Sequence, residues 1–284
     1  MEIARPLKEF NGIYCTHMRD ETEQVMESLD ESFRVGRELD VPVVISHHKV
    51  MGTRSRGRSK ETLLRIAEAM RSQPVCLDCY PYRAASTMLS YARTLICSRV
   101  IVSSSRPHPQ FAGMDLDEVV RKMGLPVEEA IAKLQPASAI YFSMDEADVQ
   151  RILSFEHTMI GSDGLPHGIA PHPRLWGCFP RVLGHYSRDL KLFPLETAVR
   201  KMTGLPAKTF GLKDRGVLRG GLRGHHRFRF EDRGRHRDVG AADPSRTGHR
   251  RDDRQRRSRL ARRQADRRKV RAGVEKAVKG KDAR

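Results

Sequence analysis

The feature that most restricts the fold is an apolar, β-branched run at residues 41–46, which reads V-P-V-V-I-S. Such a run without alternation is typical of a strand buried on both faces of a parallel sheet. Two further short strands are expected at 12–17 and 75–80, and the stretches between the three strands, 21–40 and 59–72, carry helical patterning. This alternation of strands and helices predicts βαβ units and an α/β fold.

The two predicted helices differ in how well their boundaries are marked. The helix at 21–40 has acidic residues near its start, as the helix dipole favours, but Val35 and Leu39 fit its apolar face less well. The helix at 59–72 has Ser59 as its candidate N-cap, because a serine hydroxyl can accept a hydrogen bond from a free backbone N–H of the first turn.

The middle of the chain is less regular. Residues 83–114 are rich in Ser, Arg and Pro around a short β-branched run at 100–102, and we interpret them as an insertion or loop region. Residues 163–180 are rich in Gly, Pro and His, which predicts a loop. The remaining expected elements are strands at 138–142 and 158–162 and helices at 116–123, 127–134, 145–154, 194–203 and 206–210.

The positive charge is concentrated at one end of the chain. The 284 residues contain 53 Lys+Arg and 35 Asp+Glu, a net charge of +18, which by itself indicates a nucleic-acid or membrane-surface partner. Residues 220–284 hold 23 Lys+Arg and 9 Asp+Glu, a net of +14, whereas residues 1–219 have a net of only +4. The segment 220–284 also has few aliphatic residues, so we expect a basic, largely disordered tail after a globular part at 1–219.

Compartment signals favour a cytoplasmic protein. No apolar run approaches the length of a membrane span, and the N-terminus lacks the layout of a signal peptide. The five cysteines are odd in number and scattered, which indicates reduced thiols. Cys76 and Cys79 form a C-x-x-C inside an apolar strand, and no second C-x-x-C follows, so we expect buried thiols there.

Three polar residues lie at the carboxyl ends of predicted strands. They are His17, His47 and Asp163. In a parallel barrel, catalytic residues from distant parts of the sequence converge at the carboxyl ends of the strands, and two imidazoles with a carboxylate match the ligands of a zinc-type site. For any one histidine alone, a cap on a strand end is the simpler interpretation. His48 is the rival of His47, because adjacent strand residues point to opposite faces.

Lys49, Tyr80 and Arg174 also lie at strand ends or in the loop expected at 163–180. A lysine and an arginine at this rim could hold a substrate carboxylate through charge-assisted hydrogen bonds. The alternative from these residues alone is that they are ordinary surface cations.

Seven segments together resemble the N-acyl-D-amino-acid deacylases (D-aminoacylases) of the amidohydrolase superfamily. The resemblance covers roughly residues 10–219. The segments are G-I-Y-C-T-H-M-R-D-E (12–21), V-P-V-V-I-S-H-H-K-V (41–50), D-C-Y-P-Y (78–82), S-R-P-H-P-Q-F-A-G (105–113), M-I-G-S-D-G-L-P-H (159–167), P-H-P-R-L-W-G-C-F-P-R-V-L-G (171–184) and E-T-A-V-R-K-M-T-G-L-P-A (196–207).

The resemblance implies a metal-dependent (β/α)8 barrel that hydrolyses N-acyl-D-amino acids, small molecules, to a carboxylate and a free D-amino acid. By matching positions, His17 and His47 resemble the imidazole ligands of a tightly bound Zn2+, and Asp163 resembles the catalytic carboxylate that activates water. Lys49, Tyr80 and Arg174 resemble the contacts to the substrate carboxylate and carbonyl region.

The sequence departs from the family pattern at both ends. The family has an H-x-D or H-x-H motif and a cysteine ligand that would lie upstream of His17, so we expect this chain to be the C-terminal portion of the barrel. From about residue 220 the family continues with strands of a small β-domain, whereas this sequence becomes arginine-rich. Our hypothesis is that residues 220–284 are read in a shifted frame, which resequencing of the gene would test.

Two other functions remain open at this point. One is a non-catalytic nucleic-acid-binding protein that acts through the basic tail. The other is a different amidohydrolase branch, either dihydroorotase-like or a D-glutamate-selective deacylase. The deacylase hypothesis is preferred because it rests on individual residues, whereas the nucleic-acid hypothesis rests on charge alone.

Overall fold

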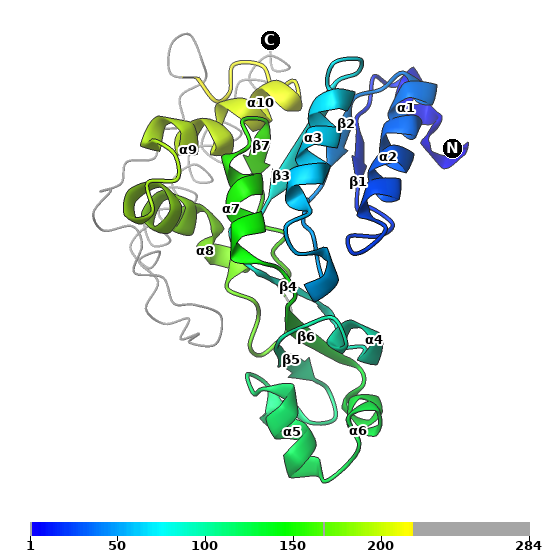
Figure 1. Ribbon diagram of the computed structural model, residues 1–284, viewed down its shortest axis with the longest axis vertical. Helices are drawn as coiled ribbons and strands as arrows, with labels where there is room; N and C mark the ends of the chain where they lie inside the picture. The colour runs from blue at the N-terminus through cyan, green and yellow to red at the C-terminus, as the bar shows by residue number, and fades with distance from the viewer. Residues whose placement is uncertain (1, 167, 218–284) are drawn as a thin grey trace, which may run out of the picture. The chain divides into compact units, whose positions relative to one another are not determined.

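The computed structural model describes residues 2–166 and 168–217 (Figure 1). The tail predicted at 220–284 lies outside the described residues. Within them, the expected α/β fold is confirmed: helices alternate with the strands of a parallel sheet, and a separate antiparallel sheet interrupts the series.

The parallel sheet has four strands in the order β1-β2-β3-β7. They are β1 (Tyr14–Thr16), β2 (Val43–Ile45), β3 (Val75–Cys79) and β7 (Thr158–Ile160). All three pairings are parallel, so the carboxyl ends of the four strands lie along one edge of the sheet. The strands expected at 12–17, 41–46, 75–80 and 158–162 are therefore confirmed, each slightly shorter than predicted.

Three helices cover one face of this sheet: α2 (Val25–Leu39), α3 (Ser59–Ala69) and α7 (Glu146–Ser154) (Figure 1). Their apolar side chains share one core with the strands; its members include Leu29, Phe33, Ile66, Leu77 and Ile152. Each large apolar side chain buried in this way contributes about 1.5–3 kcal/mol to folding relative to an exposed one.

Helix α2 is buried on a second side as well. Val35 and Leu39, which do not fit its main apolar face, are 8% and 7% exposed and pack with Val41. The partly buried side chains of Ala4 and Leu7 cover this cluster from the N-terminal segment. An amphipathic pattern with one face therefore underestimated how much of α2 is buried.

Gly36 allows α2 to lie directly on the sheet. A Cβ atom at this position would collide with the side chain of Val43 in β2 and approach the Gln73 amide oxygen. Only a residue without a side chain permits this close helix–strand approach.

The region at 83–114 and the strand at 138–142 form a second, antiparallel sheet of order β4-β6-β5. Its strands are β4 (Ala84–Met88), β5 (Val100–Ser105) and β6 (Ala137–Phe142), and its helices are α4 (Tyr91–Thr94), α5 (Leu116–Met123) and α6 (Val127–Leu134). The expected insertion is thus present, but it is ordered as a sheet rather than a loop. The serines of β5 are accommodated because Ser103 and Ser105 donate to the carbonyls of Ala170 and Leu134.

The loop expected at 163–180 is wrong in its second half. Helix α8 begins at Arg174 and runs to Arg181, directly after Pro173, whose carbonyl accepts the first hydrogen bonds of the helix from Trp176 and Gly177. A proline before the first turn favours helix initiation, and this effect outweighed the Gly, Pro and His content of the segment.

The C-terminal part of the described chain continues helically from α8. It comprises a π-helical stretch, η4 (Val182–Asp189), followed by α9 (Leu195–Met202) and α10 (Gly204–Thr209). The remaining short elements are α1 (Pro6–Glu9), η1 (Glu2–Ala4), η2 (Thr53–Ser55) and η3 (Pro109–Phe111).

The state of the cysteines and the character of the helices can be compared with the sequence expectations. The five cysteines, all within the described residues, are free thiols, and Cys76 and Cys79 are buried as predicted. Among the described residues, no helix combines the length and apolar character needed to cross a membrane.

Helix α3 is capped by another helix rather than by its own Ser59. Ser59 is the first helical residue, and the Asp148 carboxylate of α7 accepts the backbone N–H groups of Gly57 (2.7 Å) and Ser59 (3.2 Å). Asp148 also forms an ion pair of 2.6 Å with Arg151. The prediction that Ser59 caps α3 is wrong because this buried carboxylate, distant in sequence, supplies the acceptor.

We predict that Asp148→Ala lowers the free energy of unfolding by about 2–4 kcal/mol, because it leaves two backbone donors and Arg151 without their buried acceptor. Urea denaturation of the full chain measures this loss. The matched control is Asp145→Ala, which removes the N-cap bond to the Ala147 N–H and should cost about 1 kcal/mol. Equal losses in the two variants would contradict the assignment of Asp148 as a shared cap.

Candidate metal centre and active site

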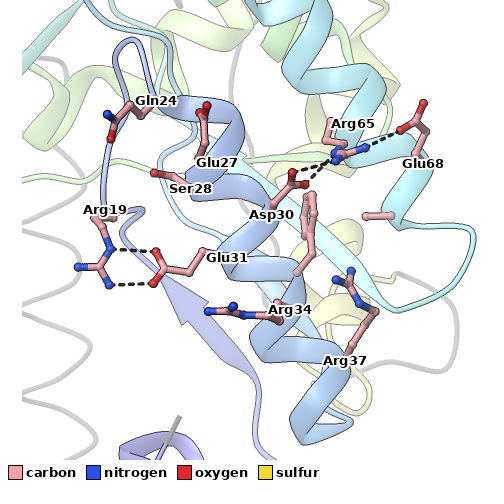
Figure 2. A pocket seen from close by; sticks show the side chains of 12 residues that line it. Arg19, Gln24, Glu27, Ser28, Asp30, Glu31, Arg34, Arg37, Arg65 and Glu68 are labelled. Atoms are coloured by element: carbon pink, nitrogen blue, oxygen red, sulfur yellow. Dashed lines mark hydrogen bonds and ion pairs between the residues drawn. The ribbon is translucent and has the colours of Figure 1, made fainter.

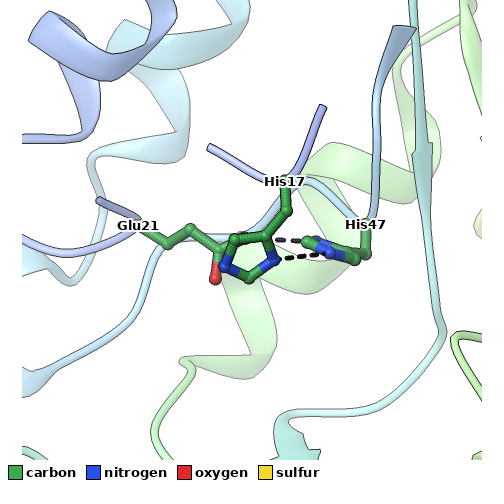
Figure 3. A group of neighbouring side chains, drawn as sticks. All are labelled: His17, Glu21 and His47. Atoms are coloured by element: carbon green, nitrogen blue, oxygen red, sulfur yellow. Dashed lines mark hydrogen bonds and ion pairs between the residues drawn. The ribbon is translucent and has the colours of Figure 1, made fainter. Parts of the chain in front are cut away.

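Two histidines meet where adjacent parallel strands end. β1 and β2 are paired in a register that sets Thr16 opposite Ile45, so the chain leaves both strands at the same edge of the sheet. His17 follows β1 directly and His47 lies two residues after β2. Their Nδ1 and Nε2 atoms, respectively, are 2.9 Å apart (Figure 3). Burial lowers the pKa of His17, which favours the neutral imidazole that a metal requires.

The backbone of His47 is strained, and hydrogen bonds to Asp78 hold it in place. Its φ is 41°, in the left-handed region that non-glycine residues rarely adopt. The His47 N–H donates to the Asp78 carboxylate at 2.9 Å, and the next N–H, of His48, donates to the Asp78 carbonyl at 2.7 Å. A Cβ at Gly161 would approach Asp78 Oδ1 to 2.6 Å, so glycine is needed there to leave room for this carboxylate.

His48, the rival of His47, points away from the site. It is fully buried, and its Nε2 pairs with the Thr62 hydroxyl of α3 at 3.0 Å. Burial lowers the pKa of His48 to about 4, so this imidazole is neutral at physiological pH. Only His47 of this pair lies beside His17.

Glu21 is part of the same cluster, and sequence reasoning missed it. Its Oε1 lies 3.1 Å from His47 Nδ1 and 2.6 Å from Lys49 Nζ, and its side chain is only 4% exposed. One ligand atom each from His17, Glu21 and His47 lies within 4.8 Å of the other two (Figure 3). Burial alone would raise the pKa of Glu21, but hydrogen bonds from His47 and Lys49 hold it at about 2.

In the sequence, Glu21 is one of the acidic residues at the start of the helix predicted at 21–40, where the helix dipole favours them. In the structure α2 begins only at Val25, and the preceding residues form a turn in which the Asp20 carboxylate accepts the Thr22 and Gln24 N–H groups. The turn directs Glu21 inward. Its spacing of four residues from His17 was the available signal.

Lys49 is buried beside this cluster instead of lying on the surface. Its ammonium group contacts Glu21, the His47 carbonyl (2.9 Å) and His47 Nδ1 (2.7 Å), and lies 5.6 Å from the centre of the Tyr80 ring. Burial lowers the pKa of Lys49, while the Glu21 carboxylate opposes this shift. The interpretation of Lys49 as an ordinary surface cation is therefore wrong.

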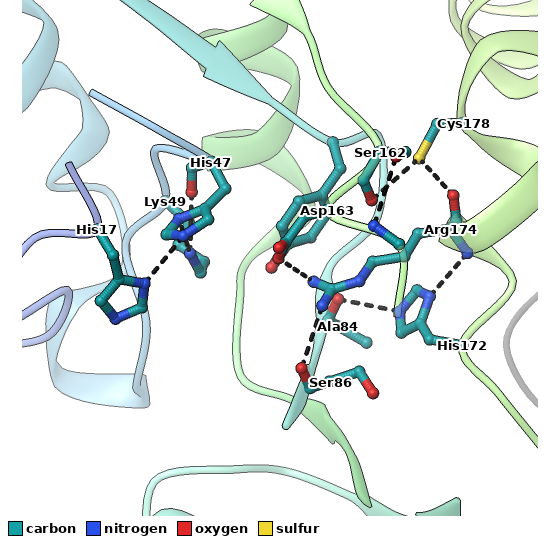
Figure 4. A network of polar contacts seen from close by, with 12 residues as sticks. His17, His47, Lys49, Ala84, Ser86, Ser162, Asp163, His172, Arg174 and Cys178 are labelled. Atoms are coloured by element: carbon teal, nitrogen blue, oxygen red, sulfur yellow. Dashed lines mark hydrogen bonds and ion pairs between the residues drawn. The ribbon is translucent and has the colours of Figure 1, made fainter. Parts of the chain in front are cut away.

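Asp163 lies across the site and pairs with Arg174. Asp163 Oδ2 and Arg174 Nη1 are 2.7 Å apart, and Asp163 has a φ of 45°, a second strained position among the candidate residues (Figure 4). The Asp163 carboxylate also acts electrostatically on His17 and Lys49. The structure thus brings the third predicted residue within electrostatic reach of His17 and Lys49, although the group of ligand atoms within 4.8 Å of one another contains Glu21 and not Asp163.

Arg174 is buried, with its guanidinium 4.6 Å from the centre of the Tyr80 ring and Nη2 donating to the Ser86 carbonyl of β4 at 3.1 Å. His172 fixes the start of α8, because its Nδ1 accepts the Arg174 N–H at 2.9 Å while its Nε2 donates to the Ala84 carbonyl at 3.0 Å (Figure 4). Burial lowers the pKa of His172 to about 3, so the His172 imidazole makes both hydrogen bonds in its neutral form.

Two buried polar groups in this site have no hydrogen-bond partner among the described residues. They are the Tyr80 hydroxyl and Arg174 Nε. Burying such groups unpaired costs about 1–3 kcal/mol each. Both therefore have hydrogen-bonding capacity that a ligand could satisfy, and burial keeps Tyr80 protonated by raising its pKa.

A groove of about 740 Å³ between α2 and α3 does not belong to this site. Several of its charges form ion pairs: Arg19 with Glu31 at 2.8–3.0 Å, and Arg65 with Asp30 at 2.7–2.8 Å (Figure 2). We interpret it as a solvated, ion-paired groove between two surface helices.

The arrangement combines converging imidazole nitrogens, a nearby carboxylate, and two cations beside one tyrosine. Imidazole pairs of this kind hold divalent transition metals, and a carboxylate next to such a metal can move a proton to and from water. Cations at the same site bind carboxylate groups of substrates.

The chain is similar to known proteins over most of its length. The model of the amidohydrolase family matches residues 127–225. A D-aminoacylase of Alcaligenes xylosoxydans xylosoxydans is 62% identical over 221 residues, which are 78% of this chain and 46% of that protein. An N-acyl-D-aspartate deacylase of the same organism is 50% identical over 222 residues, covering 78% of this chain and 45% of the relative.

Solved structures agree with these relatives. A crystal structure of D-aminoacylase has a TM-score of 0.74 at 60% identity, covering 78% of this chain and 47% of that one. An N-acyl-D-glutamate deacylase from Bordetella bronchiseptica, complexed with zinc and a phosphonate inhibitor, has a TM-score of 0.74 at 42% identity, covering 77% and 47%. The chain spans somewhat less than half the length of these relatives. Over the shared residues, it is similar to the D-aminoacylases and related deacylases of the amidohydrolase family.

Proposed function

We propose that this chain carries the carboxyl-terminal barrel strands of a metal-dependent N-acyl-D-amino-acid deacylase, with residues 1–219 as the catalytic portion. The reaction is hydrolysis of the amide bond to give a carboxylate and a free D-amino acid. The observation that carries the proposal is the meeting of His17 Nδ1 and His47 Nε2 at the ends of two parallel strands, with Asp163, Lys49, Tyr80 and Arg174 around them.

The residues present fit a bound Zn2+. Two imidazole nitrogens, His17 Nδ1 and His47 Nε2, face one another. Among the described residues, His17 Nδ1 has no other hydrogen-bond contact. His17 and His47 would hold the ion, with Asp163 as a further carboxylate ligand. When bound, the metal polarises the amide carbonyl and lowers the pKa of water. The D-aminoacylase structures include one concerned with a binuclear metal centre, which supports a metal of this type here.

The chain's own residues supply binding and proton transfer. Asp163 takes a proton from water and returns it to the leaving amine, a role that its position facing the histidines permits. Arg174, with its unpaired Nε, binds the substrate carboxylate, and Lys49 adds positive charge beside it. The Tyr80 hydroxyl donates to the carbonyl oxygen of the substrate, where negative charge develops.

The nucleic-acid and dihydroorotase-like alternatives have no specific observation in their favour within residues 2–166 and 168–217. The basic segment on which the nucleic-acid hypothesis rests lies outside the described residues. We therefore propose a single function, with an N-acyl-D-amino acid as the small-molecule partner.

The purified 284-residue chain should contain zinc and release D-methionine from N-acetyl-D-methionine. Removal of the metal with a chelator should abolish this activity, and Zn2+ should restore it, because the two imidazoles have no catalytic role without the ion. Metal content by mass spectrometry and chiral chromatography of the product test this. Absence of both metal and product would refute the proposal.

Asp163→Asn should lower kcat by about 10²–10⁴-fold, since the amide cannot accept a proton. The measurement is steady-state kinetics at matched zinc content. Asp189→Asn is the control, because Asp189 is exposed and pairs with its neighbour Arg188. Equal kcat values for Asp163→Asn and the parent would exclude Asp163 as the catalytic carboxylate.

Arg174→Met should lower kcat/KM for N-acetyl-D-methionine by about 10–100-fold, which is the loss expected for a charge-assisted hydrogen bond to a carboxylate. N-acetyl-D-methioninamide lacks that carboxylate. The parent should therefore prefer the acid over the amide, and the variant should lose this preference. An unchanged acid-to-amide ratio would contradict a carboxylate contact, even if both rates fall because Asp163 loses its partner.

A further inference from the structure

The buried Glu21 carboxylate lies behind His47, on the side of the ring away from His17. His47 Nε2 faces His17 Nδ1 at 2.9 Å, whereas His47 Nδ1 faces Glu21 Oε1 at 3.1 Å and Lys49 Nζ at 2.7 Å. The Glu21 backbone is fixed as well, because its carbonyl accepts the Met51 N–H at 2.7 Å. His47 thus has one nitrogen toward the candidate metal position and the other toward a carboxylate and an ammonium group.

A neutral His47 ring carries its proton on either Nδ1 or Nε2, not on both. If Nε2 is a metal ligand, the proton must be on Nδ1, and it then needs an acceptor. Lys49 cannot be that acceptor, because an ammonium group only donates. Among the contacts of His47 Nδ1 in the described residues, Glu21 Oε1 is the acceptor.

Lys49 favours the opposite tautomer. Its ammonium group could donate to a bare Nδ1, which would place the proton on Nε2, facing His17 Nδ1 and blocking both nitrogens as ligands. With Glu21 present, Lys49 instead has an anionic acceptor at 2.6 Å and the His47 carbonyl at 2.9 Å. Glu21 also neutralises a buried positive charge that would otherwise repel a divalent cation.

We propose that Glu21 is a positioning residue: it holds His47 in the Nδ1–H tautomer and pairs with Lys49, so that His47 Nε2 is free to bind the metal. The inference rests on the proposed metal-dependent function. It gives Glu21 a role behind His47 and not as a ligand, since Glu21 Oε1 contacts Lys49 Nζ and His47 Nδ1, the ring nitrogen that does not face His17.

The test compares the parent chain with Glu21→Gln and the control Glu23→Gln. Glu23 carries the same functional group two residues away. Its side chain is 62% exposed, and its ion pair with the exposed Arg54 is long, at 3.4 Å. In the metal-free proteins, 15N NMR of labelled histidines reports which nitrogen of His47 bears the proton, with assignment by a His47→Gln variant. Competition with a chromogenic chelator measures the affinity for Zn2+.

We expect the parent and Glu23→Gln to show the Nδ1–H tautomer and equal zinc affinity. Glu21→Gln should shift His47 toward the Nε2–H tautomer and weaken zinc binding about 10–100-fold, the usual cost of losing a carboxylate behind a histidine ligand. The double variant Glu21→Gln/Lys49→Met should recover the Nδ1–H tautomer, because the competing donor is gone. A loss of structure would not produce this recovery.

Other outcomes overturn the proposal in distinguishable ways. An unchanged tautomer with weaker zinc binding in Glu21→Gln would make Glu21 a direct ligand. An unchanged tautomer and unchanged affinity would deny it any role at His47. If the parent itself binds no zinc, the proposed function fails, whereas the tautomer of the metal-free proteins still decides the role of Glu21.

Discussion

The site depends on the parallel pairing of β1 with β2. Because Thr16 lies opposite Ile45, the two chains leave the sheet side by side, and the histidines that follow meet at 2.9 Å although they are 30 residues apart. A shift of one residue in this register would turn one of the two side chains to the other face. The helices α2, α3 and α7 stabilise the register indirectly, since they bury the same face of all the strands and leave the strand ends free for polar residues.

The charges around the histidines are then constrained by burial. Lys49 and Arg174 are both almost fully buried, and each has one anionic partner, Glu21 or Asp163. Removing one member of such a pair leaves an uncompensated buried charge, which is strongly destabilising. The two ion pairs share the Tyr80 ring, which lies within 5.6 Å of both cations. Both cations therefore lie against one aromatic side chain, and the positive charge of Arg174 acts on Lys49.

Local sequence patterns predicted the elements whose burial follows a simple period. Helices α5 and α6 begin and end at the residues expected, and the run at 41–46 is a buried strand of the parallel sheet. Patterns failed where a partner distant in sequence decides the outcome. Ser59 does not cap α3 because Asp148 does, 89 residues later, and Val35 is buried because the N-terminal segment covers it.

The same distinction applies to the candidate site. His17, His47 and Asp163 could be identified because each follows a strand, which is a local feature. Glu21 could not, since its importance comes from contacts with His47 and Lys49, 26 and 28 residues away, and its local sequence resembles an ordinary helix start. Asp78 was missed for the same reason, because its carboxylate acts on the His47 backbone from a neighbouring strand.

Two of the candidate site residues also have a strained backbone. His47 and Asp163 both have φ values in the left-handed region, at 41° and 45°, and conformations of this kind cost about 1–3 kcal/mol each in a residue with a side chain. Glycine adopts the left-handed region without this cost, as it does at Gly124, where φ is 63°. Glycine has no imidazole or carboxylate, however, so these positions can keep their side chains only if the surrounding contacts hold the backbone. The Asp78 carboxylate supplies such a contact to the His47 N–H, and its position in turn requires Gly161. The strain at His47 is thus sustained by a partly buried carboxylate and by the glycine that leaves room for it.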